Sequence, residues 1–113
     1  MKINKRSADK IEKAIEANRK MLIAFGEESR QQLLVLMLSM DSKEIRSSEL
    51  AEKTNLSRPA VSHHMQILKD AGLLKSRKEG RKIYYSFNPD VKKLDSVIQL
   101  IESVKEVIKL REE

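Results

Sequence analysis

The chain has 113 residues, of which 40% are hydrophobic and none is cysteine, and its formal net charge is +6. This length suits one domain, and the lack of cysteine excludes disulfides, thiolate metal sites and thiol-based redox sensing. No apolar run reaches the roughly 20 residues that a membrane span needs, and the basic, polar residues 1–10 do not have the pattern of a secretory signal peptide, so we expect a cytoplasmic protein.

The positive charge is concentrated in the middle of the chain. Residues 43–82 contain ten basic and five acidic residues, an excess of +5, whereas residues 87–113 contain five basic and six acidic residues, a balance of −1. A basic segment of this kind favours a polyanionic partner such as nucleic acid. Charge alone does not decide the matter, because many small basic proteins bind no nucleic acid.

The first segment with a clear period is residues 8–25, which we expect to form one helix that Gly26 ends. One narrow stripe recurs at spacings of three and four, as on a single helix face. The stripe consists of Ile11, Ile15, Asn18, Leu22 and Phe25.

Residues 27–40 are expected to form the central helix of the domain. Every residue from 33 to 38 is apolar, and a helix that is apolar on all sides is normally buried. Ser29 and Gln32 have the spacing of a capping box at its start. A polar loop follows, in which Ile45 is expected to form a short strand.

Residues 47–72 have the pattern of a helix-turn-helix, with helices over 47–54 and 57–72. Ala51 is small where two helices cross closely. Asn55 is expected to adopt the left-handed conformation of the turn. Ser57 can cap the second helix, and Pro59 is tolerated in its first turn because those amides have no helical partners.

The second of these helices has a core face and an exposed polar face. Val61, Met65 and Leu68 fall on the core face. A helix in the major groove reads bases mainly with its N-terminal residues, and an arginine there can contact guanine through two hydrogen bonds. The candidate DNA-binding residues on the exposed face are Ser57, Arg58, Pro59, Ser62, His63 and Gln66.

A basic β-hairpin is predicted over residues 73–87, with strands over 73–77 and 82–87 around a turn that contains Gly80. Ile83, Tyr85 and Phe87 alternate toward the core. A basic hairpin beside a recognition helix can contact phosphates, which adds affinity without sequence information. The candidate residues are Lys78, Arg81 and Lys82.

The last expected helix covers residues 90–111. Its apolar residues occupy about half of its circumference, which is more than one small domain can bury, so we predict that it packs on a second copy of the chain. A two-fold dimer would present two recognition helices to successive major grooves of a roughly palindromic site. The expected interface residues, from both end segments, are Ile11, Ile15, Leu22, Leu94, Ile98, Ile101, Val104 and Ile108.

The stretch from Phe25 to Asn88 resembles the ArsR/SmtB family of bacterial winged-helix repressors. Four motifs carry the resemblance: Phe25-Gly26-Glu27-Glu28-Ser29-Arg30, Glu49-Leu50-Ala51, the run from Leu56 to Met65, and Gly80-Arg81-Lys82-Ile83-Tyr84-Tyr85. The chain departs from the family in having Glu28 where a proline is usual.

This resemblance implies a mainly α fold with a β-hairpin wing, in which residues 1–113 form a single winged-helix domain. It assigns dimerisation to residues 8–25 and 90–111, the helix-turn-helix to 47–72 and the wing to 73–87. It also implies a DNA-binding transcriptional regulator, expected to act as a repressor. The base-reading positions would be Arg58, Pro59, Ser62 and His63.

The metal-binding residues of that family are missing from this chain. Metal-sensing members have cysteine on the helix before the turn, or histidine and acidic residues on the last helix, whereas residues 47–54 contain no cysteine and residues 90–113 contain no histidine. His63 and His64 are the only histidines, and adjacent helical residues point about 100° apart, so they do not chelate one ion. We therefore expect no metal and no cofactor, and the effector stays unidentified.

Three other functions are less consistent with the sequence. The main alternative is a winged-helix module for protein–protein interaction that docks through the hairpin or the last helix, because fold does not fix function. Binding of double-stranded RNA is disfavoured since the RNA major groove is too narrow for a helix. An enzyme is rejected because the sequence has no nucleophile–base arrangement or phosphate-binding glycine loop. The operator, the regulated genes and the choice between repression and activation lie beyond the sequence.

Overall fold

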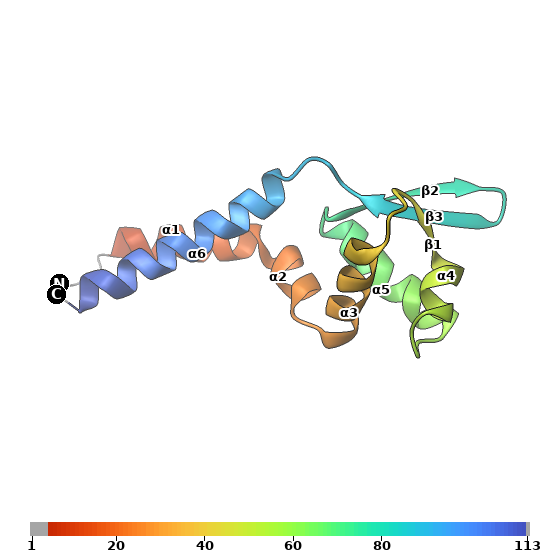
Figure 1. Cartoon of the computed structure of the whole chain (residues 1–113). Helices are drawn as coiled ribbons and strands as arrows, with labels where there is room; N and C mark the ends of the chain where they lie inside the picture. Colours follow the sequence, from red (N-terminus) through yellow and green to blue (C-terminus); the bar gives the residue numbers. More distant parts are fainter. Residues whose placement is uncertain (1–4, 113) are drawn as a thin grey trace.

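The computed structural model describes residues 5–112 of the chain (Figure 1). Residues 1–4, which belong to the segment expected to carry no signal peptide, and residue 113 lie outside that description. The elements follow in the order α1 (Lys5–Ala17), α2 (Arg19–Phe25), α3 (Glu28–Ser39), β1 (Ile45–Arg46), α4 (Ser47–Glu52), α5 (Arg58–Asp70), β2 (Leu74–Glu79), β3 (Lys82–Phe87) and α6 (Lys92–Arg111).

The three strands form one antiparallel sheet in the order β1-β3-β2. Ile45 in β1 pairs with Tyr85 in β3, and Leu74 in β2 pairs with Phe87, the last residue of β3. The predicted short strand at Ile45 and the predicted hairpin are thus both confirmed. The expected fold, mainly α with a β-hairpin wing around a helix-turn-helix, is also confirmed.

The core lies where α2, α3, α4 and α5 meet one side of the sheet. Its largest fully buried side chains come from α3, α4 and α5 and are Leu33, Leu50, Val61, Met65 and Leu68. The sheet contributes Tyr85, whose pKa is raised because its hydroxyl is partly removed from water. The predicted core face of the second helix of the helix-turn-helix is therefore correct.

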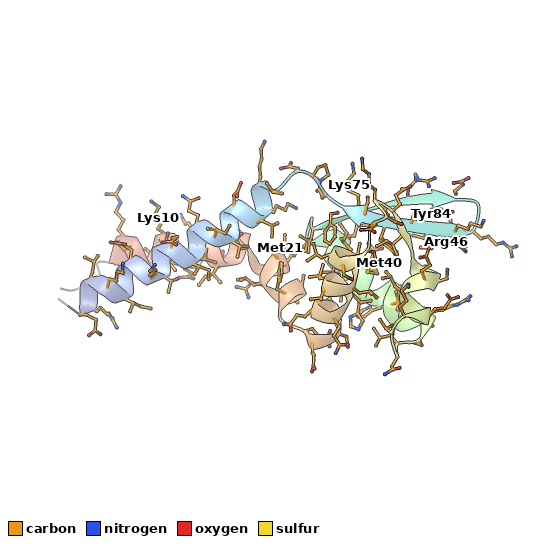
Figure 2. All side chains as sticks on the ribbon, in the orientation of Figure 1. Lys10, Met21, Met40, Arg46, Lys75 and Tyr84 are labelled. Carbon is orange, nitrogen blue, oxygen red and sulfur yellow. The ribbon has the colours of Figure 1, made fainter. Side chains whose placement is uncertain are left out.

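Helices α1 and α6 lie side by side and extend away from this head as an arm, with the start of α1 and the end of α6 at its far end (Figure 1). The molecule consequently measures 57 × 24 × 24 Å. Figure 2 shows Lys10 on the arm and Met21 at the junction of arm and head, where Met21 is buried. None of the helices in the described range 5–112 has the length and hydropathy needed to cross a membrane.

The single helix expected over residues 8–25 is wrong, because the chain breaks at Asn18 into α1 and α2. Asn18 is buried, and its side-chain amide donates a hydrogen bond to the carbonyl of Ala14 at 2.8 Å. Its backbone N–H bonds to Ala14 and Ile15 together, so the helix tightens and ends there. The break lets α1 follow α6 while α2 stays in the head.

The prediction that residues 27–40 form a helix buried on all sides is correct for the helix and wrong for its burial. Val35 and Leu38 are 66% and 71% exposed, because no other part of the described chain covers that face of α3. The capping box predicted for Ser29 and Gln32 is also wrong. Glu27, in place of Ser29, is the N-cap, and its carboxylate accepts a hydrogen bond from the backbone N–H of Arg30 at 2.9 Å.

Candidate nucleic-acid interface

Helix α5 has one fully buried face and one exposed face. Val61, Met65 and Leu68 are completely buried against the head, which fixes the rotation of the helix about its own axis. The residues predicted from sequence to contact DNA are all exposed, namely Ser57, Arg58, Pro59, Ser62, His63 and Gln66. The structure therefore brings these side chains together over the first half of α5 and keeps them accessible to a large ligand.

The start of α5 is organised by Ser57. Its hydroxyl oxygen accepts a hydrogen bond from the backbone N–H of Ala60 at 3.2 Å, as expected of an N-cap, and Pro59 lies in the first turn. The Ser57 side chain thus caps the helix and is also exposed to solvent.

The turn before Ser57 is built differently from the prediction. No residue other than glycine has a positive φ in the described chain, so Asn55 does not adopt the left-handed conformation. Thr54 organises the turn instead. Its hydroxyl donates to the carbonyl of Leu50 at 2.7 Å and accepts from the N–H of Leu56 at 3.3 Å. A threonine hydroxyl that closes the preceding helix makes a left-handed residue unnecessary.

Further along α5, Gln66 is tied to its own helix. Its side-chain amide donates to the carboxylate of Asp70 at 2.9 Å, one turn later. His63 and Ser62 lie nearer the start of the helix. Because readout in the major groove depends mainly on the N-terminal part of such a helix, Arg58, Ser62 and His63 have the more favourable position for base contacts.

The hairpin presents positive charge at its tip. Glu79 pairs with Lys82 across the turn formed by Gly80 and Arg81, and Gly80 has a φ of +61°, a conformation that favours glycine. Lys78, Arg81 and Lys82 are exposed. Exposed long cations at the end of a rigid hairpin suit contact with phosphates.

Arg77, the residue before Lys78, is exposed, but its guanidinium is engaged in contacts with other residues of the chain. Its guanidinium donates to Glu44 at 2.9 and 3.0 Å and to Glu79 at 2.8 Å, and it stacks on the ring of Tyr84 at 4.5 Å. The hydrogen bond from Arg77 lowers the pKa of Glu44, and the two carboxylates raise the pKa of Arg77. Arg77 thus braces the hairpin against the loop before β1, and Glu79, the acidic residue of the turn, has its charge balanced.

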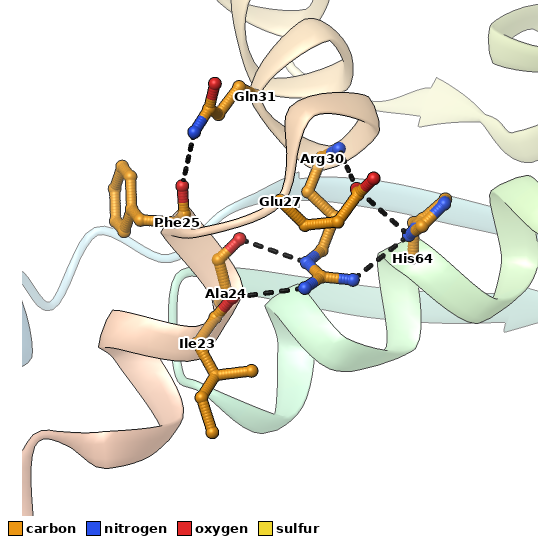
Figure 3. A network of polar contacts seen from close by, with 7 residues as sticks. All are labelled: Ile23, Ala24, Phe25, Glu27, Arg30, Gln31 and His64. Carbon is orange, nitrogen blue, oxygen red and sulfur yellow. Dashed lines mark hydrogen bonds and ion pairs between the residues drawn. The ribbon is translucent and has the colours of Figure 1, made fainter.

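On the inner side of α5 lies a polar network that sequence reasoning missed (Figure 3). Arg30, although charged, is only 7% exposed, and its Nη1 lies 3.2 Å from Nδ1 of His64. The backbone N–H of Arg30, followed by that of Ser29, bonds to the Glu27 carboxylate and lowers its pKa from the usual 4.5. Helical periodicity treats a charged residue as a surface residue, so it gave no sign of this site.

No group of three His, Cys, Asp or Glu side chains in residues 5–112 is arranged to hold a metal ion. The rings of His63 and His64 lie 5.7 Å apart, with their planes inclined by 54°. His63 is exposed, whereas His64 is partly buried toward Arg30. The two adjacent histidines therefore have different surroundings and do not form one site.

The residues predicted for a dimer interface fall into two groups on the arm and α2. Ile11, Leu22, Leu94 and Val104 are half-buried by contacts within the chain. Ile15, Ile98, Ile101 and Ile108 are 40%, 60%, 55% and 56% exposed. The exposed residues of α6 lie on one face of that helix, since they recur at spacings of three and seven. An apolar stripe thus stays open to solvent on the isolated chain.

Several known proteins resemble this chain in sequence and in fold. Residues 28–76 match the family model described as "Bacterial regulatory protein, arsR family". The chain is 33% identical over 105 residues to an uncharacterised HTH-type transcriptional regulator, MJ1325, of Methanocaldococcus jannaschii, covering 93% of this chain and 98% of that protein. It is 35% identical over 68 residues to the transcriptional repressor SdpR of Bacillus subtilis, covering 60% of this chain and 72% of SdpR.

A solved structure of similar fold is also that of a transcriptional regulator. A crystal structure of a possible transcriptional regulator for arsenical resistance superposes with a TM-score of 0.61 at 33% identity, covering 75% of this chain and 83% of that one. The alignment with the archaeal regulator extends over nearly the full length of both chains, so it includes the arm as well as the helix-turn-helix. The chain belongs to the ArsR family of DNA-binding transcriptional regulators.

Proposed function

We propose that the chain acts as a homodimeric, sequence-specific DNA-binding repressor whose α5 enters the major groove and whose hairpin contacts the flanking phosphates. The observation that carries the proposal is the division of α5 into a face locked in the core by Val61, Met65 and Leu68 and an exposed face that bears Arg58, Ser62 and His63. A recognition helix needs this combination, because base contacts require a fixed helix and free side chains.

The two contact surfaces have different roles in this proposal. Arg58, Ser62 and His63 carry hydrogen-bonding groups that suit base edges. Lys78, Arg81 and Lys82 carry flexible positive charges that suit the DNA backbone and supply affinity without sequence preference. Two copies related by a two-fold axis would read a roughly palindromic operator. The whole chain acts as one winged-helix unit, has no catalytic role, and works in the cytoplasm.

Repression is proposed because SdpR, a relative over most of its own length, is named a transcriptional repressor. Regulation by a metal is not part of the proposal, since the chain has no cysteine and its two histidines are adjacent on one helix. Zinc, nickel or copper should therefore leave its DNA affinity unchanged.

Selection from random-sequence duplexes tests the proposal. The protein should enrich a roughly palindromic sequence, and it should bind that duplex more tightly than a scrambled one, with both affinities falling as salt rises. Enrichment of no sequence, together with weak and equal binding to both duplexes, would favour the alternative of a protein–protein interaction module. Adding each metal to the same assay tests the exclusion of metal control.

A further inference from the structure

Arg30 joins the end of α2 to the body of the head. Its Nε donates to the carbonyl of Ala24 at 3.0 Å, and its Nη2 donates to the carbonyl of Ile23 at 3.1 Å (Figure 3). These carbonyls belong to the last turn of α2, where backbone acceptors have no helical partners and carry partial negative charge. The guanidinium is therefore buried with acceptors that fix its position.

The remaining nitrogen of that guanidinium, Nη1, faces α5. Arg30 Nη1 lies 3.2 Å from Nδ1 of His64. Arginine has donors only, so this contact is a hydrogen bond when Nδ1 of His64 is unprotonated and accepts. If Nδ1 carries a proton, two N–H groups face each other, and when both ring nitrogens are protonated two positive charges face each other as well. The geometry thus selects the neutral imidazole with its proton on Nε2.

Three charged or titratable groups surround His64. Arg30 faces it from α3, and Glu27, the N-cap of α3, places Oε2 at 3.8 Å from Nδ1. His63 is its neighbour on α5, with ring centroids 5.7 Å apart. Protonation would repel the His64 ring from Arg30 and draw it toward the Glu27 oxygen that already holds the backbone of Arg30. The corner between α2 and α3 would then lose its hydrogen bond to α5, the one between Arg30 and His64.

We propose that Arg30 is a positioning residue for the recognition helix, which it holds in place through neutral His64, so that protonation of His64 weakens sequence-specific DNA binding. This inference rests on the proposed function. His63 is the residue before His64, so a small displacement of α5 moves a proposed base contact directly. Base contacts demand exact geometry, whereas phosphate contacts by flexible lysines tolerate displacement. The specific affinity should therefore fall more than the affinity for unrelated DNA.

The test compares binding to the selected duplex and to its scrambled version between about pH 8 and about pH 5, the range in which histidine changes charge. For the unmutated protein, the ratio of the two affinities should fall roughly tenfold toward low pH, the effect of losing about one base contact. His64→Asn keeps an acceptor close to the position of Nδ1 and does not protonate. It should retain the ratio at high pH and lose most of the decline.

Two further variants separate positioning from general stability. Arg30→Met should lower the ratio at every pH. His64→Leu, which leaves the backbone contacts of Arg30 intact, should lower it in the same way and serves as the test should Arg30→Met not fold. A ratio that declines equally in the unmutated protein and in His64→Asn overturns the inference, because the pH dependence would then come from a group other than His64. A ratio left unchanged by His64→Leu also overturns it. Equal binding to both duplexes at all pH values instead refutes the proposed function.

Discussion

Ser57 and Arg58 are neighbours at the start of α5, and the structure gives them different tasks. The Ser57 hydroxyl caps the helix through the N–H of Ala60, so its replacement by alanine would cost about 1 kcal/mol of stability. Arg58 is exposed at the helix end that would face the bases. Stability and recognition are therefore assigned to adjacent residues that can be tested separately.

Arg58→Ala should lower affinity for the selected duplex by roughly 1–3 kcal/mol and relax the preference at one base position, because a bidentate contact to guanine would be lost. Affinity for scrambled DNA should change much less. Lys69→Ala, which removes a charge from the exposed last turn of the same helix, is the matched control. Equal losses on both duplexes would show that Arg58 contacts the backbone.

Glu27 gives a prediction about stability and pH. Its pKa is lowered from 4.5 by the backbone N–H of Arg30, then by that of Ser29, so the ionised carboxylate favours the folded state. This contribution is present above the usual value of 4.5 and is lost as pH falls through the lower value of the folded state. Glu27→Gln should therefore be less stable than the unmutated protein at neutral pH and should lose less stability on acidification.

Urea unfolding at neutral pH and at a pH below 4.5 measures this difference. Glu106→Gln, at an exposed position on the arm, should follow the unmutated protein at both values. An identical acid dependence of the Glu27 variant and the unmutated protein would mean that the N-cap charge does not stabilise the head.

At the scale of elements, the hairpin of β2 and β3 presents positive charge at its tip. Arg77 fastens β2 to Glu44 and Tyr84, while Arg81 occupies the turn itself. Arg81→Ala should weaken binding to selected and scrambled duplexes alike and lower the slope of log affinity against log salt by about one unit per subunit, since each copy would lose one phosphate contact. Lys109→Ala, near the end of α6, removes the same charge far from the hairpin and should leave the slope unchanged. A change in sequence preference with Arg81→Ala would assign base readout to the wing.

The elements that the sequence predicted correctly have local signals. Ser57 and Pro59 mark the start of α5, and Gly80 marks the turn of the hairpin, because each residue type suits the backbone geometry that it adopts. The break at Asn18 has no such signal, since the stripe of spacings three and four continues through it. Asn18 is the one polar residue on that stripe, and the period of the stripe does not change there.

The period of a helix predicted the buried face of α5 correctly, but it did not predict which residues of α3 are buried. Val35 and Leu38 look like core residues by composition, yet their face of α3 is left largely open to solvent. Arg30 looks like a surface residue, yet the last carbonyls of α2 and the ring of His64 surround it. Both errors concern tertiary contacts, which the period of a single helix does not contain.

At the scale of the whole molecule, the exposed apolar residues are not scattered. Ile98, Ile101 and Ile108 form the open stripe of α6, and Leu94 continues it to an apolar hollow of about 400 Å³. The hollow is lined by Phe25, Gln31, Leu34, Val35, Leu38, Leu73, Phe87 and Leu94. An open surface of this extent is typical of proteins that associate.

Ile101→Glu should therefore convert the homodimer to a monomer or weaken it strongly at micromolar concentration, because an unpaired charge would enter an apolar interface. Sedimentation measures the change, and binding to the palindromic duplex should weaken with it. Gln99→Glu, which adds the same charge on the opposite, exposed side of α6, should stay dimeric. A monomeric unmutated protein at that concentration would contradict the proposed assembly.

Asn18, where the first helix breaks, has a consequence for the DNA itself. The chain passes between the arm and the head at two joints, one at Asn18 and one at the segment around Asn88, whose side chain donates to the carbonyl of Gly72 at 3.1 Å and accepts from the N–H of Asp90 at 3.0 Å. In the proposed dimer, the bend at these joints would set the distance between the two copies of α5. The spacing between half-sites that the protein accepts would then depend on Asn18 and Asn88, two side chains outside the proposed DNA-contacting surfaces.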